Sequence, residues 1–354
     1  MKTPFFATSA YRALISGLLA SSGVALLGAP ASASAVTNQS VPGAQTGVSC
    51  LTSTLCVLVG SSTKGTGDVI VVSGGKAAKP VEVKGAKTLY AISCPVPAGC
   101  VAVGRAAGSS APWLVELDSK GKVLSSAPLR VAAGISFSTI SCKSMFACEL
   151  AGTTAPTGSP SLALAQWDGN MARVFSVPVP RGAARPSLSS ISCMATNCVA
   201  VGSAATDSGV EGLVVDIVNW RRFQVRTTPG DWIGGVACTS TSLCFASGYD
   251  RSAGFVLTIG NGAPGLATAT PGDKLDGIAC NGSSCLAVGV EPFPGRGNGH
   301  RVGSLVHISD GRATGTQLVA ASGGFTSVGG PLIGPGFAAV GPGQLSGSQV
   351  ATLP

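Results

Sequence analysis

The chain has 354 residues, of which 50 are Gly and 22 are Pro, while only 11% are charged and 5% aromatic. The 45% hydrophobic content argues against a disordered chain, and the Gly or Pro that interrupts nearly every ten residues argues against a helical one. The 23 Lys and Arg and the 15 Asp and Glu are mostly scattered singly, so no basic stripe predicts nucleic-acid binding.

The first 35 residues predict a secretory signal peptide. Lys2 and Arg12 give a positive start, an apolar run follows at 13–28, and 29–35 read APASASA, which ends in the A-x-A pattern of a cleavage site. The run is too short and too rich in Gly and Ser for a membrane span, and no later stretch approaches one. We therefore expect residues 36–354 to be secreted, extracellular or associated with the cell wall, without membrane insertion.

A motif with two cysteines recurs six times along the rest of the chain. The copies are VSCLTSTLCVLVG (48–60), ISCPVPAGCVAVG (92–104), ISCKSMFACELAG (140–152), ISCMATNCVAVG (191–202), VACTSTSLCFASG (236–248) and IACNGSSCLAVG (278–289). A seventh copy without cysteines reads SVGGPLIGPGFAAVG (327–341). Self-similarity at a period near 45 residues is the signature of a solenoid or a propeller.

Each repeat is predicted to form four strands, which we call a, b, c and d. In the second repeat these are TLYAISC (88–94), CVAVG (100–104), PWLVELD (112–118) and KVLSSAPL (122–129). The c–d links carry dipeptides that suit two-residue hairpin turns, namely Gly74-Gly75, Asp168-Gly169, Asn261-Gly262 and Asp310-Gly311. We predict an all-β fold, a single seven-bladed β-propeller of four-stranded antiparallel blades that occupies residues 36–354.

The two ends of the chain are predicted to close the ring. The last repeat stops after a third strand, SQVATL (348–353), whereas residues 35–44 precede the first repeat where a strand d would lie. We expect this N-terminal segment to pair with 348–353 as the fourth strand of the last blade, because an open ring would leave an unpaired edge.

The twelve cysteines are predicted to form disulfides within their own repeats, since each pair flanks a short turn in a chain with a secretory signal. The predicted pairs are Cys50–Cys56, Cys94–Cys100, Cys142–Cys148, Cys193–Cys198, Cys238–Cys244 and Cys280–Cys285. A loop of this length is expected to stabilise the fold by about 2.4 kcal/mol per bridge. A zinc site needs four ligands and the chain has only two histidines. We therefore predict no metal site. A redox-active cysteine pair normally has two intervening residues, whereas these pairs have four or five, so a redox role is not predicted either.

The Ser-Cys and Cys-x-Ala-Val-Gly unit resembles the tandem repeats of a group of secreted actinobacterial proteins. In these, a strand that ends in Trp-Asn-Gly separates the copies, and QWDGNMARVFSVPVP (166–180) is similar to that element. The resemblance covers nearly all of the chain after residue 35. It implies a propeller of the sialidase-like or YVTN-like superfamily and assigns no activity.

The sequence contains no H-E-x-x-H, no G-x-S-x-G and no calcium-binding loop. We therefore predict no catalytic residues and no cofactor. His307 lies in the predicted strand SLVHISD, where we expect it to pack in the sheet, and His300 lies in the long b–c insertion EPFPGRGNGH (291–300).

In a propeller the a–b and c–d turns lie on one face, here the disulfide face, and the b–c and d–a loops lie on the other, the loop face. Binding residues are usually carried by variable loops on a rigid frame, and Trp, Tyr and Arg are common anchors of contacts. The loop segments 104–113, 229–235, 248–254 and 291–301 carry the predicted ligand-binding residues Trp113, Trp232, Tyr249, Asp250, Arg251, Arg296, His300 and Arg301.

The predicted function is that of a secreted, non-enzymatic and monomeric binding or scaffold module. Its expected partner is a cell-wall polysaccharide or an extracellular protein. The alternative is a propeller hydrolase or lyase that acts on a glycan or a cyclic peptide through the loop face, and a purely structural surface protein is a third possibility.

Overall fold

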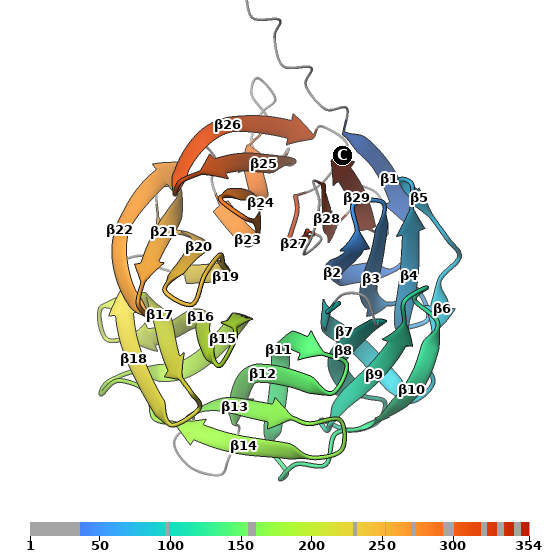
Figure 1. The fold of residues 1–354 in the computed structure, drawn as a ribbon, viewed down its shortest axis with the longest axis horizontal. Coiled ribbons are helices and arrows are strands. Elements are labelled where there is room, and N and C mark those ends of the chain that lie inside the picture. Colours follow the sequence, from blue (N-terminus) through green and yellow to red (C-terminus); the bar gives the residue numbers. More distant parts are fainter. Residues whose placement is uncertain are drawn as a thin grey trace, which may run out of the picture. The chain divides into compact units, whose positions relative to one another are not determined.

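The computed structural model describes residues 36–95, 99–154, 161–228, 232–251, 253–270, 274–292, 301–319, 324–330, 336–342 and 348–353. Seven antiparallel sheets stand around a common axis as the blades of a propeller (Figure 1). The predicted all-β, seven-bladed fold is confirmed. The predicted signal peptide at 1–35 lies outside the described residues. In the part of the chain that the structure describes, no helix is long and apolar enough to cross a membrane.

The strands follow the predicted order, from innermost a to outermost d. Blade 1 consists of β2 (Ala44–Thr52), β3 (Leu55–Ser61), β4 (Gly67–Ser73), β5 (Lys76–Ala77) and β6 (Val81–Glu82). Blade 2 consists of β7 (Ala86–Ser93), β8 (Gly99–Ala106), β9 (Pro112–Asp118) and β10 (Val123–Pro128). Blade 3 consists of β11 (Ile135–Ser144), β12 (Ala147–Thr154), β13 (Ser161–Trp167) and β14 (Ala172–Val177). Blades 4 and 5 consist of β15 (Ala184–Met194), β16 (Asn197–Thr206), β17 (Gly209–Val218) and β18 (Arg222–Thr228); and β19 (Trp232–Cys238), β20 (Leu243–Tyr249), β21 (Gly254–Gly260) and β22 (Ala263–Thr270). Blades 6 and 7 consist of β23 (Lys274–Asn281), β24 (Ser284–Pro292), β25 (Arg301–Ser309) and β26 (Arg312–Val319); and β27 (Ser327–Gly329), β28 (Phe337–Pro342), β29 (Ser348–Leu353) and β1 (Thr37–Val41).

The N-terminal strand closes the ring as predicted. β1 is the outermost strand of blade 7 and pairs antiparallel with β29, from Thr37 opposite Thr352 to Val41 opposite Ser348 (Figure 1). The first and last strands of the propeller therefore share one sheet, and the closure requires no covalent bond between them.

The outer strand of blade 1 differs from the four-strand prediction. It is divided into β5 and β6, which both pair with β4. Pro80 lies between the two pieces. Proline has no backbone N–H and therefore cannot donate to a ladder, so it is tolerated at such an outer edge.

The hydrophobic core lies between the blades rather than at the centre of the ring. The described buried residues form seven clusters, each of which joins two neighbouring blades. Strands c, such as β4, β13 and β17, contribute side chains to both sides, which explains why their sequences read as continuous apolar runs. Small side chains fill the middle of the strands b, where the motif alanines Ala102, Ala200 and Ala287 are fully buried.

The glycine that ends each motif copy is required by a bulge in the strand opposite. In blades 1 to 6 the register between strands a and b shifts near the start of strand a. This bulge brings a backbone carbonyl against the motif glycine. A Cβ at Gly104 would lie 2.1 Å from the Thr88 carbonyl oxygen, and one at Gly289 would lie 1.8 Å from that of Lys274. A side chain at this position would therefore displace strand a.

The serine that precedes the first cysteine of the motif links one blade to the next. Its hydroxyl oxygen accepts a hydrogen bond from the backbone N–H of the first cysteine in the following blade, at 2.9–3.2 Å. The pairs are Ser49 with Cys94, Ser93 with Cys142, Ser141 with Cys193 and Ser192 with Cys238. Blades 5 and 6 carry Ala237 and Ala279 at the same position and have no hydroxyl to offer.

All six predicted disulfides are present, and no described cysteine is free. The paired Cα atoms are 3.8–4.1 Å apart, across the hairpin of strands a and b. Each bridge therefore lies inside one blade, at the a–b turn on the disulfide face.

Candidate functional site

A central channel of about 340 Å³ runs between the innermost strands of all seven blades. Its lining consists mainly of glycine, alanine and hydroxyl side chains. Several of these hydroxyls are engaged in the frame, because Thr46, Ser138 and Ser189 each donate to a backbone carbonyl of the next blade. Among the described lining residues, Asp276 has the only carboxylate. The chemically distinctive part of the channel therefore lies in blade 6.

Asp276 belongs to a cluster of aromatic and charged side chains at the loop-face end of the channel, which we call the mouth cluster: Trp232, Tyr249, Lys274 and Asp276. Trp232 begins β19 and lies directly opposite Tyr249 at the end of β20, with ring centroids 5.3 Å apart. Lys274 begins β23 in the next blade. Its ammonium nitrogen lies 5.1 Å from the Trp232 ring centroid and 4.9 Å from that of Tyr249.

The same ammonium group forms an ion pair with Asp276, with Nζ 2.9 Å from Oδ1. Burial raises the pKa of Asp276, and the hydrogen bond and charge of Lys274 act in the opposite direction. Lys274 is therefore held between two aromatic rings and a carboxylate. Such cation–π contacts contribute about 0.5–2 kcal/mol each, depending on how far they are desolvated. These contacts hold the Trp232 and Tyr249 rings in fixed orientations at the end of the channel.

Gly234 makes room for the Trp232 ring. A Cβ on Gly234 would lie 2.3 Å from the ring and 2.4 Å from the Asp276 carbonyl oxygen. The matching position, four residues before the first cysteine, is occupied by Thr46, Ser138 and Ser189 in other blades. The absence of a side chain at this point of blade 5 allows the indole to lie against the inner strand, next to blade 6.

Sequence reasoning identified half of this cluster. Trp232 and Tyr249 were predicted to be ligand-binding, and the structure brings them together. Lys274 and Asp276 were missed, although KLDGIAC (274–280) is the repeat copy that has two charged residues at the start of strand a. That local departure from the other copies is the signal that could have identified them.

The other predicted residues lie elsewhere. Asp250 and Arg251 follow Tyr249 in the b–c loop of blade 5, where the Asp250 carboxylate accepts a hydrogen bond from the Ala253 N–H at 2.9 Å. The guanidinium of Arg251 extends to Gly209 at the edge of blade 4. Both residues therefore lie beside the mouth cluster, on the side of blade 5 that faces blade 4.

Trp113 was predicted both as the end of the loop segment 104–113 and as the second residue of the strand 112–118, and it is the second residue of β9 in blade 2. Its indole N–H donates to the Ser126 hydroxyl at 2.7 Å, and its ring packs against Gly85. These contacts give Trp113 a packing role in its own blade. Arg296 and His300 lie outside the described residues, and Arg301 is described only as the first backbone position of β25.

His307 lies in β25 as predicted, but the expectation that it packs in the sheet is wrong. Its side chain is exposed. The register explains this, because His307 lies on the sheet face opposite to that of its buried neighbours Val306 and Ile308 near the strand end.

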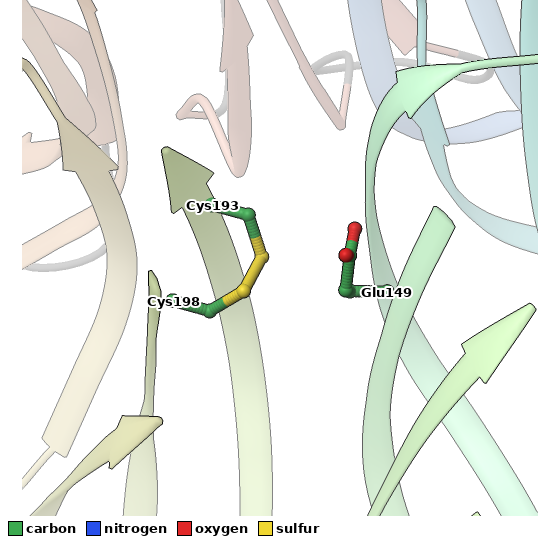
Figure 2. Close-up of side chains that lie close together, drawn as sticks. All are labelled: Glu149, Cys193 and Cys198. Atoms are coloured by element: carbon green, nitrogen blue, oxygen red, sulfur yellow. A yellow bond between two sulfur atoms is a disulfide. The ribbon is translucent and has the colours of Figure 1, made fainter. Parts of the chain in front are cut away.

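Figure 2 shows the described group that comes nearest to a metal site, in which Glu149 faces the Cys193–Cys198 disulfide of the next blade. The carboxylate and the two sulfur atoms lie within 4.8 Å of one another. Both sulfur atoms are bonded to each other, and metal coordination requires thiolates. Glu149 instead pairs with Lys143, 2.5 Å away.

The disulfide face carries a wider variety of side chains than we expected from its short turns. A pocket of about 470 Å³ in blade 3 is lined by Trp167, Arg173 and two exposed apolar side chains, Phe146 and Met171. A smaller pocket lies between blades 4 and 5, with Asp216 and Arg222 in its lining. The strand ends of one blade and the groove between two blades thus each form a concave site that was not predicted from the sequence.

No known protein-family model and no curated protein matches this chain. The resemblance to secreted actinobacterial repeat proteins therefore stays a prediction. The solved structures that are similar to it include U3-55K (10% identity, TM-score 0.63), the WD40 repeats of RRP9 (11%, 0.65) and the β-propeller domain of Cps50 (Swd1) from Myceliophteria thermophila (11%, 0.58). The similarity covers 89–92% of this chain and 98% of each of the others. At such identities it concerns the fold, which is a WD40-like seven-bladed β-propeller with a disulfide in six of its blades.

Proposed function

We propose that the protein is a secreted, non-enzymatic binding or scaffold module for an extracellular protein or a cell-wall polysaccharide, and that the mouth cluster is its principal contact surface. The observation that carries the proposal is the convergence of Trp232, Tyr249 and Lys274 from two blades at one end of the channel. Tryptophan and tyrosine dominate binding energies at interfaces, because their large surfaces lose little conformational entropy when they are covered.

The state of the charged groups supports binding rather than catalysis. Lys274 and Asp276 neutralise each other. A general acid or base instead needs a polar group that is directed at a reacting atom. Six disulfides and a closed ring hold the surface rigid, which lowers the entropy cost of association.

The test is a binding array of glycans, cell-wall polymers and purified extracellular proteins, probed with the wild-type protein and with W232A, Y249A and F146A variants. Phe146 is the matched control, because it is an exposed aromatic residue on the disulfide face. We expect W232A and Y249A each to weaken the array ligand by about tenfold or more, the usual cost of losing an aromatic anchor, and F146A to bind like the wild type. A ligand that is lost only in F146A would show that the other face is functional.

A further inference from the structure

The pocket between blades 4 and 5 has a volume of about 200 Å³ and opens on the disulfide face. Its polar lining comes from the turns and strand ends of both blades: Asn197, Asp216 and Arg222 from blade 4, and Ser240, Thr241, Ser242 and Asn261 from blade 5. The volume is below the range of about 300–1,000 Å³ that accommodates drug-sized ligands. An occupant would therefore have the size of one sugar ring or one amino acid.

Asp216 is the unusual residue of this pocket. It lies in β17, where the neighbouring side chains Val215 and Ile217 are fully buried, and only 7% of its own surface is exposed. In the described part of the chain, no hydrogen bond or ion pair reaches its carboxylate. A Cβ on Gly262 would lie 2.0 Å from the Asp216 Cγ, so the carboxyl group occupies the space that a side chain would take.

The arginines near Asp216 do not neutralise it by direct contact. Arg226 donates to the Gly262 carbonyl oxygen at 2.8 Å and to Gln224 at 2.6 Å, so these donors point elsewhere. Burial raises the pKa of the Asp216 carboxyl, and the charges of Arg226 and Arg222 lower it. The carboxylate lines the pocket, so a cation bound there would pair with it more closely than either arginine does.

A metal ion suits this pocket poorly. Calcium takes six to eight oxygen ligands, and Asp216 has the only carboxylate in the lining. An organic cation that also carries several hydrogen-bonding groups suits it better, because the remaining lining groups are amides, hydroxyls and one guanidinium. These are the groups that hydrogen-bond to sugar hydroxyls.

We propose that this pocket binds an amino sugar with a free ammonium group, which pairs with Asp216 while Asn197, Asn261 and the serines accept and donate hydrogen bonds to its hydroxyls. The site is independent of the mouth cluster, since it lies on the opposite face. It assigns a ligand to Asp216, whose carboxyl group packs against Gly262 and makes no hydrogen bond within the described frame.

The experiment is an NMR titration of the isotope-labelled protein with glucosamine, glucose and N-acetylglucosamine, which share a ring but differ in charge. We expect glucosamine to shift the side-chain amide resonances of Asn197 and Asn261, and the two neutral sugars to bind about tenfold more weakly, as expected for the loss of one hydrogen bond to a charged group. D216N should lose this preference for the charged sugar. E116Q should keep it, because Glu116 occupies the same position on strand c of blade 2.

Equal binding of the three sugars by the wild-type protein would overturn the proposal, and so would the absence of shifts at tens of millimolar glucosamine. Shifts confined to the loop face, or an unchanged preference in D216N, would also overturn it. The wild-type comparison needs no variant, so a D216N protein that failed to fold would leave the test decisive.

Discussion

At the scale of single residues, Asp68 shows what the packing between blades 7 and 1 imposes on a charged group. Its side chain is fully buried in β4, and the Gln45 side-chain amide donates to both carboxylate oxygens, at 3.1 and 3.3 Å. Burial nevertheless raises the pKa of Asp68 to about 6, from 3.8. In the same pair, the Gln45 Oε1 atom is buried and has no partner among the described residues.

This pKa gives the stability of the protein a pH dependence of defined sign. Since the folded pKa of Asp68 exceeds the unfolded value, the folded state binds more protons between pH 3.8 and about 6, and its contribution to the free energy of unfolding falls as pH rises through that range. A shift of this size corresponds to about 3 kcal/mol. We expect Asp68→Asn to remove the slope and to be more stable than the wild type at pH 7.5, because an amide can also donate to Gln45.

Urea denaturation at pH 3 to 8 measures this effect, and Asp118→Asn provides a control of opposite sign at the acid end of that range. The Asp118 carboxylate accepts hydrogen bonds from the Lys120 and Lys122 N–H groups, which lower its pKa. Asp118 therefore raises the free energy of unfolding at pH values above its pKa in the unfolded chain, and this contribution is lost as the pH falls through its lower pKa in the folded protein. A D68N protein with the wild-type pH profile would contradict the burial argument.

Trp220 shows a residue conformation that no turn preference predicts. Asn219 and Trp220 form the c–d turn of blade 4 with φ values of +50° and +53°. For a residue other than glycine, adopting this left-handed backbone conformation costs about 1–2 kcal/mol. The Trp220 ring packs 5.5 Å from Phe175 and 6.2 Å from Phe223, and this packing between blades 3 and 4 offsets the backbone strain.

At the scale of elements, the repeated motif has three parts with three separate tasks. The cysteines join strands a and b, the glycine admits the bulge of strand a, and the serine bonds to the next blade. Only the first task was predicted from the sequence. The other two depend on where the bulge brings a carbonyl and where the neighbouring blade lies, and neither is encoded by spacing within one repeat.

The serine that links neighbouring blades can be removed from one blade and introduced into another, and we expect opposite changes in the free energy of unfolding. Ser93→Ala leaves the Cys142 N–H without its acceptor, and we expect it to lower the free energy of unfolding by about 1–2 kcal/mol. Ala237→Ser places a hydroxyl where blades 1 to 4 have one, and we expect it to raise that free energy by about 0.5–1 kcal/mol through a bond to the Cys280 N–H. Ser125→Ala, at an exposed site on β10, is the control. Denaturant midpoints measure all three, and equal midpoints for S93A and S125A would show that the bond contributes nothing.

At the scale of the whole molecule, the propeller has seven thin interfaces instead of one thick core, and most of their side chains are small. Small side chains bury little apolar area each, so covalent cross-links gain importance. The six disulfides restrict the unfolded chain within each hairpin, at about 2.4 kcal/mol per bridge by chain entropy, although such terms do not fully add.

Complete reduction is therefore expected to lower the thermal midpoint by about 10 °C or more, since 1 kcal/mol shifts the midpoint of a protein this size by about 2–4 °C. The β signal in circular dichroism at 20 °C should remain, because the interfaces themselves contain apolar contacts and hydrogen bonds. Thermal scans with and without a phosphine reductant measure the change, with thiol labelling as proof of reduction. An unchanged midpoint in protein with twelve labelled thiols would disprove a stabilising role.

The sequence by itself determined the number of blades, the order of strands, all six disulfides and the closure by the N-terminal segment 35–44, in which β1 occupies 37–41. Each of these follows from a pattern inside one repeat, or from counting repeats, so local spacing was sufficient. The tertiary structure alone decided that Lys274 and Asp276 join Trp232 and Tyr249, that Trp113 is held in its own sheet, and that Asp216 is the floor of a pocket. The contacts of Trp113 join different strands of one blade, and the other two features join neighbouring blades, so all three depend on side-chain packing that spacing within one repeat does not encode.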